Sequence, residues 1–265
     1  MRRQFSAEFI YQLSALIVAA ILVQAVYAVT VHPKARAVLA EQAARLTANP
    51  NYVPERSFWV LIKDYEQESE IILFLWSMAI IGYKFWNIRG ERRLLELDLI
   101  PLAEGQSILP EDTREYARGI EALPEPEREL LLPRALLAAL NRFRMTHNIP
   151  DASAEVGQVC DMHSEYLDTE LAIVRYIAWA IPAIGFIGTV RGIGGAMTQA
   201  NKAVRGDISG VIEQLGLAFN STLIALLLSM VLMFLLYGLQ QAQERLVIDA
   251  RSHSDRKLIQ HLQSR

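Results

Sequence analysis

Cysteine is almost absent from this sequence of 265 residues, in which Cys160 stands alone. A single cysteine forms no disulfide within its own chain, and it cannot supply the set of thiolates that structural zinc and iron–sulfur sites need. The five histidines are scattered, at positions 32, 147, 163, 253 and 261. We therefore expect no metal site and no cofactor.

An excess of positive charge is also missing. Lysine and arginine total 26 against 29 aspartates and glutamates, which gives a net charge of −3. Nucleic-acid binding depends on a basic surface that attracts phosphates, so we expect no nucleic-acid partner. The sequence also contains no P-loop, no HExxH and no GxSxG motif. It therefore lacks the commonest signatures of nucleotide-binding enzymes, zinc metalloproteases and serine hydrolases. We expect a protein that is not an enzyme.

Long apolar runs are what the sequence does contain. Hydrophobic residues make up 52% of it, the mean hydropathy is +0.20, and the apolar residues are clustered. Segments 9–31, 71–88, 171–196 and 214–243 are long or apolar enough to serve as membrane helices. The pattern predicts an all-α polytopic membrane protein with four transmembrane helices: 1–31, 71–88 and a C-terminal pair within 171–238.

Two features of the first two segments leave alternatives open. Arg2 and Arg3 followed by an apolar run and by Val26-Tyr27-Ala28 resemble a cleavable signal peptide. Segment 1–31 is therefore a transmembrane helix or a signal anchor, and processing before Val29 would leave three spans. Lys84 lies inside the second span, where we expect its ammonium group to extend to the headgroups.

The basic residues that flank the spans predict the orientation. They cluster near the start of the first span and after the second and fourth spans, which places these ends in the cytoplasm. Segments 32–70 and 197–212 are then an outward-facing loop and hairpin. Segment 89–170, with 17 acidic residues and nine arginines, is expected to be an acidic helical cytoplasmic domain, and 239–265 a cytoplasmic helical tail.

Helical spacing of apolar residues recurs inside the expected cytoplasmic domain. Leu136, Leu140 and Phe143 form one stripe, and Val156, Val159, Cys160 and His163 lie along another. No alternating pattern of useful length indicates a strand. We therefore expect short helices that pack on each other through these stripes.

Small and polar residues form stripes along the two C-terminal spans. Ala178, Pro182, Gly185, Thr189 and Gly192 lie three or four residues apart, and so do Ala218, Thr222, Ala225 and Ser229. Small residues let membrane helices approach closely, which makes helix packing one reading. The other reading is a pore wall in which the threonine hydroxyls hydrate an ion. The spacing alone leaves both open.

The residues IPAIGFIGTVRGI at 181–193 resemble a signature of the MotA/TolQ/ExbB proton channel family. The family pattern G-x-x-G-T-V-x-G-[IL] is matched by Gly185, Gly188, Thr189, Val190, Gly192 and Ile193. The following segment LGLAFNSTLIALLLSM at 215–230 is similar to the family's next span, with Thr222 at the second pore threonine. The resemblance covers about residues 155–262.

This resemblance implies an oligomeric channel or stator subunit in the bacterial inner membrane. Subunits of this family form a homo-oligomer, expected to be a pentamer, around single-span ExbD/TolR/MotB-like partners that each carry a membrane aspartate, and they couple the proton motive force to work. The implied roles are channel lining for Thr189, Thr222 and Ser229, a helix break or kink at Pro182, close packing at Gly185, Gly188 and Gly192, and an outer mouth at Arg191 and Glu213.

Departures from the family pattern leave the ion and the mechanism open. The TolQ/ExbB branch often has an acidic residue where this chain has Leu217, and the nearest acid is Glu213. Conduction of protons, conduction of sodium and no conduction all remain possible, and the alternative function is a non-conducting scaffold that recruits partners through its cytoplasmic domain. Arg191 and Glu213 either pair across the hairpin or meet water separately.

Overall fold

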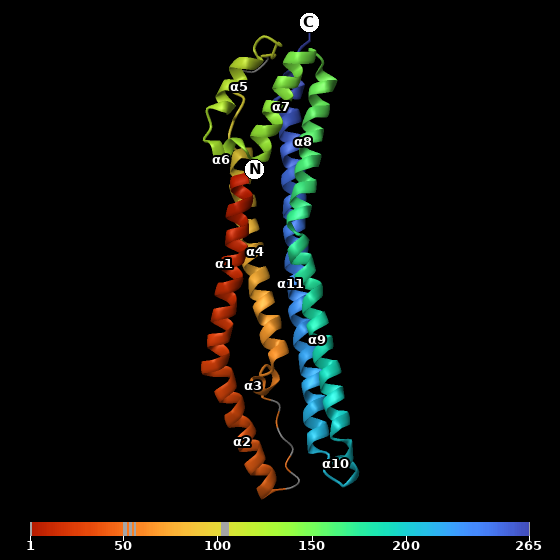
Figure 1. The fold of residues 1–265 in the computed structure, drawn as a ribbon. Coiled ribbons are helices and arrows are strands. Elements are labelled where there is room, and N and C mark those ends of the chain that lie inside the picture. The colour runs from red at the N-terminus through yellow and green to blue at the C-terminus, as the bar shows by residue number, and fades with distance from the viewer. Residues whose placement is uncertain (1, 50–51, 53–54, 56, 102–105, 265) are drawn as a thin grey trace. The chain divides into compact units, whose positions relative to one another are not determined.

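The computed structural model describes residues 2–49, 52, 55, 57–101 and 106–264. In this part of the chain the structure is helical without a β-strand, and an isolated bridge joins Ile108 to Leu262. The all-α prediction is therefore confirmed. The elements, drawn in Figure 1, are α1 (Arg2–Val26), a π-helical turn (Tyr27–Val31), α2 (His32–Ala48), α3 (Phe58–Leu61), α4 (Tyr65–Leu95), α5 (Thr113–Glu121), α6 (Glu125–Arg128), α7 (Leu131–Thr146), α8 (Ile149–Glu170), α9 (Ala172–Thr198), α10 (Ala200–Val204), α11 (Ser209–Lys257) and a 3-10 turn (Ile259–His261).

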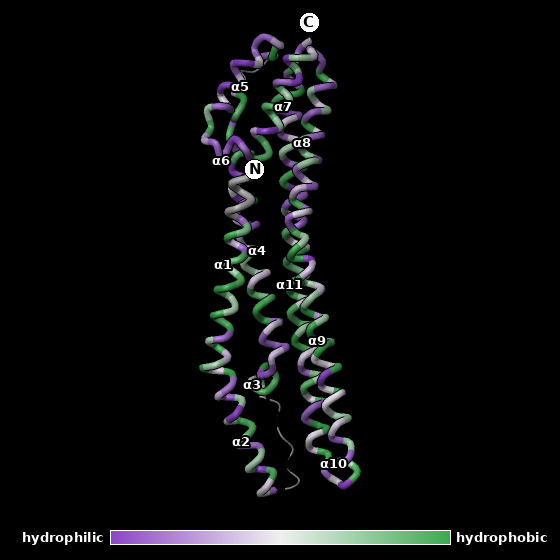
Figure 2. Tube along the Cα trace, in the orientation of Figure 1, coloured by the Kyte–Doolittle hydropathy of each residue, from purple (hydrophilic) through white to green (hydrophobic). Residues whose placement is uncertain are grey.

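Four helical segments of the described chain are long and apolar enough to cross a membrane, as predicted. They lie within Glu8–Ala48, Tyr65–Leu95, Ile149–Thr198 and Ser209–His261. Figure 2 shows their apolar stretches along α1, α4, α9 and α11. The chain is thus a multi-pass membrane protein.

The chain divides into two compact units. Unit 1 comprises Met1–Gly82 and Ile173–Leu236, and unit 2 comprises Tyr83–Ala172 and Tyr237–Arg265. The paired C-terminal spans lie in unit 1, with α9 antiparallel to the first part of α11 (Figure 1). The expected boundaries of the cytoplasmic domain at 89–170 and of the tail at 239–265 fall close to those of unit 2.

Segment 32–70, expected to be a loop, contains the helix α2 and the short helix α3. Pro33 lies in the first turn of α2, and it lacks the N–H that would otherwise donate to the preceding turn. The π-helical turn before it widens the backbone by one residue per turn and so lets the helix continue past the proline ring. Ala28 lies inside that turn, and cleavage after it stays a prediction.

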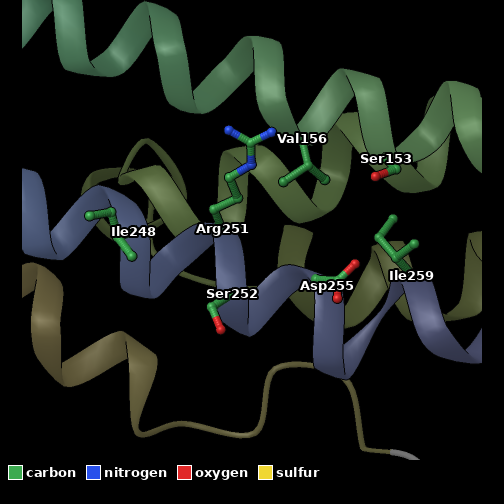
Figure 3. A pocket seen from close by; sticks show the side chains of 7 residues that line it. All are labelled: Ser153, Val156, Ile248, Arg251, Ser252, Asp255 and Ile259. Atoms are coloured by element: carbon green, nitrogen blue, oxygen red, sulfur yellow. The ribbon is translucent and has the colours of Figure 1, made fainter.

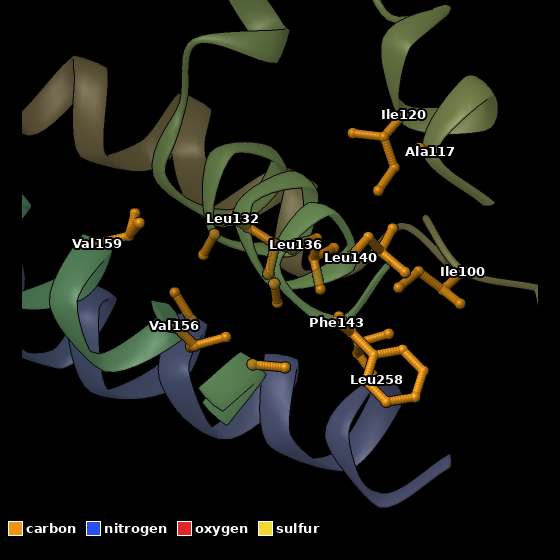
Figure 4. Close-up of a cluster of buried hydrophobic side chains, with 14 of the residues drawn as sticks. Ile100, Ala117, Ile120, Leu132, Leu136, Leu140, Phe143, Val156, Val159 and Leu258 are labelled. Carbon is orange, nitrogen blue, oxygen red and sulfur yellow. The ribbon is translucent and has the colours of Figure 1, made fainter. Parts of the chain in front are cut away.

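The core of unit 2 is formed by the apolar stripes that the sequence predicts. Leu136, Leu140 and Phe143 of α7 are fully buried against Val156 and Val159 of α8 (Figure 4). A tight connection brings the two helices together, because His147 adopts a left-handed conformation with φ 52° and Pro150 opens α8. Ala117 and Ile120 of α5 and Leu258, directly after the end of α11, also belong to this cluster.

Lys84 does not extend to the membrane surface, so that expectation is wrong. Its side chain is 4% exposed, and its Nζ lies 2.5 Å from Glu170 Oε2 within unit 2. Seven residues further along α4, Glu91 faces His163 of α8 across 3.9 Å. Two antiparallel helices repeat their contacts at about this interval, so α4 and α8 share a polar seam. The ammonium group of Lys84 is therefore paired with the largely buried Glu170 carboxylate instead of being solvated by water.

Candidate functional site at the interface of helices 9 and 11

The interface between α9 and α11 is built on glycines. A methyl group added at Gly185 would lie 2.5 Å from Ala225 Cβ, and one added at Gly192 would lie 2.6 Å from the carbonyl oxygen of Gln214. Real Cβ atoms do not approach other atoms so closely, so atoms of α11 already occupy the space that a Cβ on either glycine would need. Small residues permit this approach in a membrane, where lipid provides no hydrophobic drive between helices.

Thr189 and Thr222 meet in this interface. Their hydroxyl oxygens lie within hydrogen-bond distance of each other. The carbonyl oxygen of Gly185 is 3.2 Å from the Thr189 hydroxyl and 3.1 Å from that of Thr222, and the Ala218 carbonyl is 3.2 Å and 3.4 Å from them. Each hydroxyl has one proton to donate and several acceptors around it. Two helices thus share a small network of hydroxyl and carbonyl oxygens.

Two serines of α11 extend the row of hydroxyls. Ser221 is fully buried and donates to the Ala218 carbonyl at 3.0 Å or to the Gly185 carbonyl at 3.3 Å. Ser229, two turns further along, donates to the Ala178 carbonyl of α9 at 3.1 Å. Ser229 lies on the small-residue stripe that the sequence indicates, whereas Ser221 lies outside that stripe, although it precedes Thr222 and packs against Gly188.

Pro182 lies inside α9, which continues without interruption from Ala172 to Thr198. A proline in a helix removes one backbone hydrogen bond and crowds the carbonyl four residues earlier. The expected helix break is therefore absent, whereas a kink stays a prediction.

Arg191 forms an ion pair with Glu66 at the start of α4. The distance from its Nη2 to Glu66 Oε2 is 2.7 Å, and the side chains are 45% and 9% exposed. Arg191 thus pairs with Glu66 instead of Glu213, the partner that the sequence suggests, and Glu213 is exposed. Glu66 has two advantages over Glu213. It lies in the first turn of α4, where the helix dipole favours a carboxylate. Its Cγ also packs against Gly188 of α9, 3.1 Å from the position that a Cβ on this glycine would take.

Gln67 ties the same turn of α4 to α11. It is fully buried, and its amide group lies between the Asp64 carbonyl oxygen and the Ser221 backbone nitrogen, 3.1 Å from each. The first turn of α4 therefore contacts both helices of the pair. Sequence reasoning missed this turn, although the acidic and amide residues of YEQESE directly before an apolar run are an unusual composition for a membrane boundary.

The hairpin between the two helices is closed by a capping interaction. Asp207 Oδ1 accepts hydrogen bonds from the Ser209 hydroxyl at 2.5 Å and from the Ser209 N–H at 3.2 Å. These bonds hold the pKa of the exposed Asp207 carboxyl below its usual value. Gly206 before it has φ 98°, a conformation that glycine adopts without strain. This local geometry fixes the start of α11.

A shallow cavity of about 410 Å³ lies elsewhere, in unit 2 between α8 and α11 (Figure 3). Arg251 extends towards α8 beside Val156, and Asp255 lies near Ile259. The remaining lining residues are Ser153, Ile248 and Ser252. Its charged groups are exposed, and the described residues contain no group of three or more histidine, cysteine, aspartate or glutamate side chains that could hold a metal. The α9–α11 interface is the stronger candidate site.

The fold and the site together define a multi-pass helical membrane protein with a polar, glycine-lined contact between its last two long helices. Residues 129–252 match the model of the MotA/TolQ/ExbB proton channel family. This confirms the resemblance found at 181–193 and supports a proton-channel role. The matched region begins earlier than the resemblance, near the start of α7, and ends at Ser252. A comparison with curated proteins finds no match.

Proposed function

We propose that this chain is the channel subunit of an energiser complex in the bacterial inner membrane and couples the proton motive force to mechanical work. The observation that carries the proposal is the family match across α8, α9 and α11, with Thr189 and Thr222 joined at the centre of the matched helices. Proteins of this family are channel and transport-energiser proteins rather than enzymes, and they work with partner membrane proteins.

The chemistry of the threonine pair suits an ion path. A hydroxyl donates one hydrogen bond and accepts others, so Thr189 and Thr222 can reorient when a proton or a hydrated ion is beside them. Both side chains are only half-buried within this chain, which leaves them reachable by a helix from another protein. Ser229 adds a further hydroxyl group on α11, two helical turns after Thr222.

The apolar parts of α9 and α11 supply no carboxylate of their own. Helix α9 contains no aspartate or glutamate, and α11 has none between Glu213 and Glu244. A proton path through a membrane needs a titratable group. We therefore assign that group to the aspartate of a single-span ExbD/TolR/MotB-like partner, placed beside Thr189 and Thr222.

The outer surfaces of the two helices support an oligomer. Phe186 and Val190 of α9 and Phe219 and Phe234 of α11 are exposed on the isolated chain, by 61% to 75%. Such apolar side chains are stable in contact with lipid or with neighbouring subunits. A pentamer around the partner helices uses both kinds of contact.

Other residues of the interface then have supporting roles. Gly185, Gly188 and Gly192 allow α9 and α11 to stay in close contact while the pore works. Pro182 supplies a kink in α9. Arg191, held by Glu66, and Glu213, at the exposed start of α11, line the outer mouth, while unit 2 lies in the cytoplasm.

The proposal is tested by proton flux into liposomes that contain the purified chain. We expect flux after a membrane potential is applied when a single-span partner with a membrane aspartate is present, and none with the partner's aspartate replaced by asparagine. The partner is sought among single-span proteins encoded beside this one. Equal flux with both forms would contradict the proposal, and absence of flux with every partner would favour the scaffold.

A further inference from the structure

Glu70, in the second turn of α4, is a fully buried carboxyl group without a hydrogen-bond partner. Its side chain is 0% exposed, and neither carboxylate oxygen has a partner within the described chain. The hydroxyl of Tyr27, which is 2% exposed, is likewise buried without a partner. Native proteins rarely leave such groups unsatisfied, so each needs a physical explanation.

An apolar cluster surrounds Tyr27, and the ring of His32 lies edge-on to its ring at 5.6 Å between centroids. Tyr27 packs in a cluster with Val23, Val31 and Ile62, and Ile71, directly after Glu70, packs against this cluster. Ile224 of α11 touches it as well, so the cluster joins the first span, α4 and one of the paired helices. Glu70 lies within electrostatic reach of Tyr27.

The charged groups near Glu70 do not compensate a negative charge on it. Glu66, one turn earlier, is its charged neighbour and is itself paired with Arg191 of α9 at 2.7 Å. Before α4, Asp64 is paired with Lys63 at 2.9 Å. Three further titratable groups lie nearby: Glu68 on the same helix, which is 5% exposed, Tyr27 on the π-helical turn, and His32, whose ring lies 5.6 Å from that of Tyr27.

Within the described part of the chain, an ionised Glu70 carboxylate would accept no hydrogen bond and form no ion pair, because Arg191 is paired with Glu66 and Lys63 with Asp64. Burial of an unpaired charge in an apolar environment is so costly that the group becomes neutral instead. A carboxyl group becomes neutral by binding a proton, and the acid then has an O–H to donate. An unpartnered phenol oxygen in the same cluster is a suitable acceptor after a side-chain rotation.

We infer that Glu70 is a proton-binding site of this subunit, carried by α4 and associated with Tyr27. Residue 70 lies outside the region matched by the family model, 129–252, so the match does not assign it. Glu70 lies on α4, and the apolar cluster around Tyr27 contacts Ile224 of α11.

A proton fits this site better than a sodium ion. Sodium needs several oxygen ligands, whereas the buried side-chain oxygens without a partner at this place in the described chain are those of Glu70 and Tyr27. Proton binding needs a single oxygen lone pair. The step is a simple exchange in which the carboxylate takes up one proton from water and later returns it, so no oxidant or reductant is involved. A role of this exchange in transport rests on the proposed function, whereas the binding itself does not.

Infrared spectroscopy of the full chain in lipid tests the inference without any flux measurement. At neutral pH we expect a carbonyl stretch of a protonated carboxylic acid in the native chain. The Glu70→Gln variant should lose this band, whereas Glu41→Gln should retain it, because Glu41 is 62% exposed and paired with Arg45. Identical spectra of the native and Glu70→Gln chains would overturn the inference. A band that disappears when sodium replaces potassium would overturn it in favour of a sodium site.

A second measurement needs no variant. Dicyclohexylcarbodiimide dissolves in lipid and reacts with protonated carboxyl groups but not with carboxylates, and mass spectrometry of the digested protein locates the adduct. We expect Glu70 to be modified at neutral pH and protected at strongly alkaline pH. No adduct on Glu70, with other carboxyls of the membrane helices labelled, would overturn the inference. Either result leaves the partner-dependent flux test of the proposed function unaffected.

Discussion

Arg191 of α9 is paired with Glu66 of α4 at 2.7 Å, although 125 positions separate the two residues in the sequence. This contact fastens the start of the second span to the glycine-lined face of α9. It also satisfies a guanidinium group that would otherwise need water or headgroups at the membrane edge.

Reversing the charges of this pair tests the contact. Arg191→Glu and Glu66→Arg should each lower the melting temperature of the detergent-solubilised protein, because each places two like charges together. The double reversal should recover part of the loss, with a coupling of roughly 1 kcal/mol because the guanidinium is half-exposed. Glu213→Gln is the control and should have little effect. A double reversal equal to the sum of the singles would contradict the pairing.

Glycine-to-alanine substitutions test the close contact of α9 with α11. Gly185→Ala and Gly192→Ala should destabilise the protein by roughly 1–3 kcal/mol, because the new methyl groups would lie 2.5 Å and 2.6 Å from atoms of α11. Gly194→Ala is the matched control on the same helix, since a Cβ there meets no atom within 4 Å. It should be neutral or stabilising, as alanine favours helices. Unfolding titrations in detergent measure all three, and equal effects would refute the packing.

Lys84 and Glu170 test the buried polar seam of unit 2. Lys84→Met should cost roughly 3–5 kcal/mol in the free energy of unfolding, because it leaves the largely buried Glu170 without this cation. Lys257→Met removes the ion pair with Asp98, whose side chains are 48% and 55% exposed, and should cost less than about 1 kcal/mol. Equal costs of the two substitutions would contradict the burial of the Lys84–Glu170 pair.

The orientation can be tested with single cysteines in a Cys160→Ser background. Glu121 is exposed in unit 2, and Val204, in the hairpin after α9, is 89% exposed. A membrane-impermeant thiol reagent applied to intact cells should label Val204→Cys and leave Glu121→Cys unlabelled until the cells are opened. Labelling of Glu121→Cys from outside would overturn the cytoplasmic assignment of residues 89–170.

Local sequence patterns predict the helices and the centre of the candidate site. The three- and four-residue spacing of Leu136, Leu140 and Phe143 identifies a buried face because a helix repeats every 3.6 residues. The spacing of Thr189 and the glycines identifies one face of α9 for the same reason. These inferences concern neighbours along a single helix, and periodicity determines them.

Contacts between distant helices could not be predicted in this way. Periodicity does not reveal which helix lies opposite, so Arg191 was considered with Glu213, its neighbour across the hairpin, rather than with Glu66. Lys84 was expected at the membrane surface for the same reason, since Glu170 is 86 positions away. The burial of Glu70 and Tyr27 without hydrogen-bond partners also depends on three-dimensional packing, which no local motif indicates.

The central claim is that the hydroxyls of Thr189 and Thr222 serve ion conduction, and valine substitution tests it most directly. Valine keeps nearly the shape of threonine and removes the hydroxyl. The decisive measurement is partner-dependent proton flux of Thr189→Val, Thr222→Val and, as control, Thr198→Val, whose hydroxyl bonds its own helix at an exposed position. We predict loss of flux in the first two with oligomer size unchanged, and normal flux in the control. Normal flux in both Thr189→Val and Thr222→Val would contradict the account.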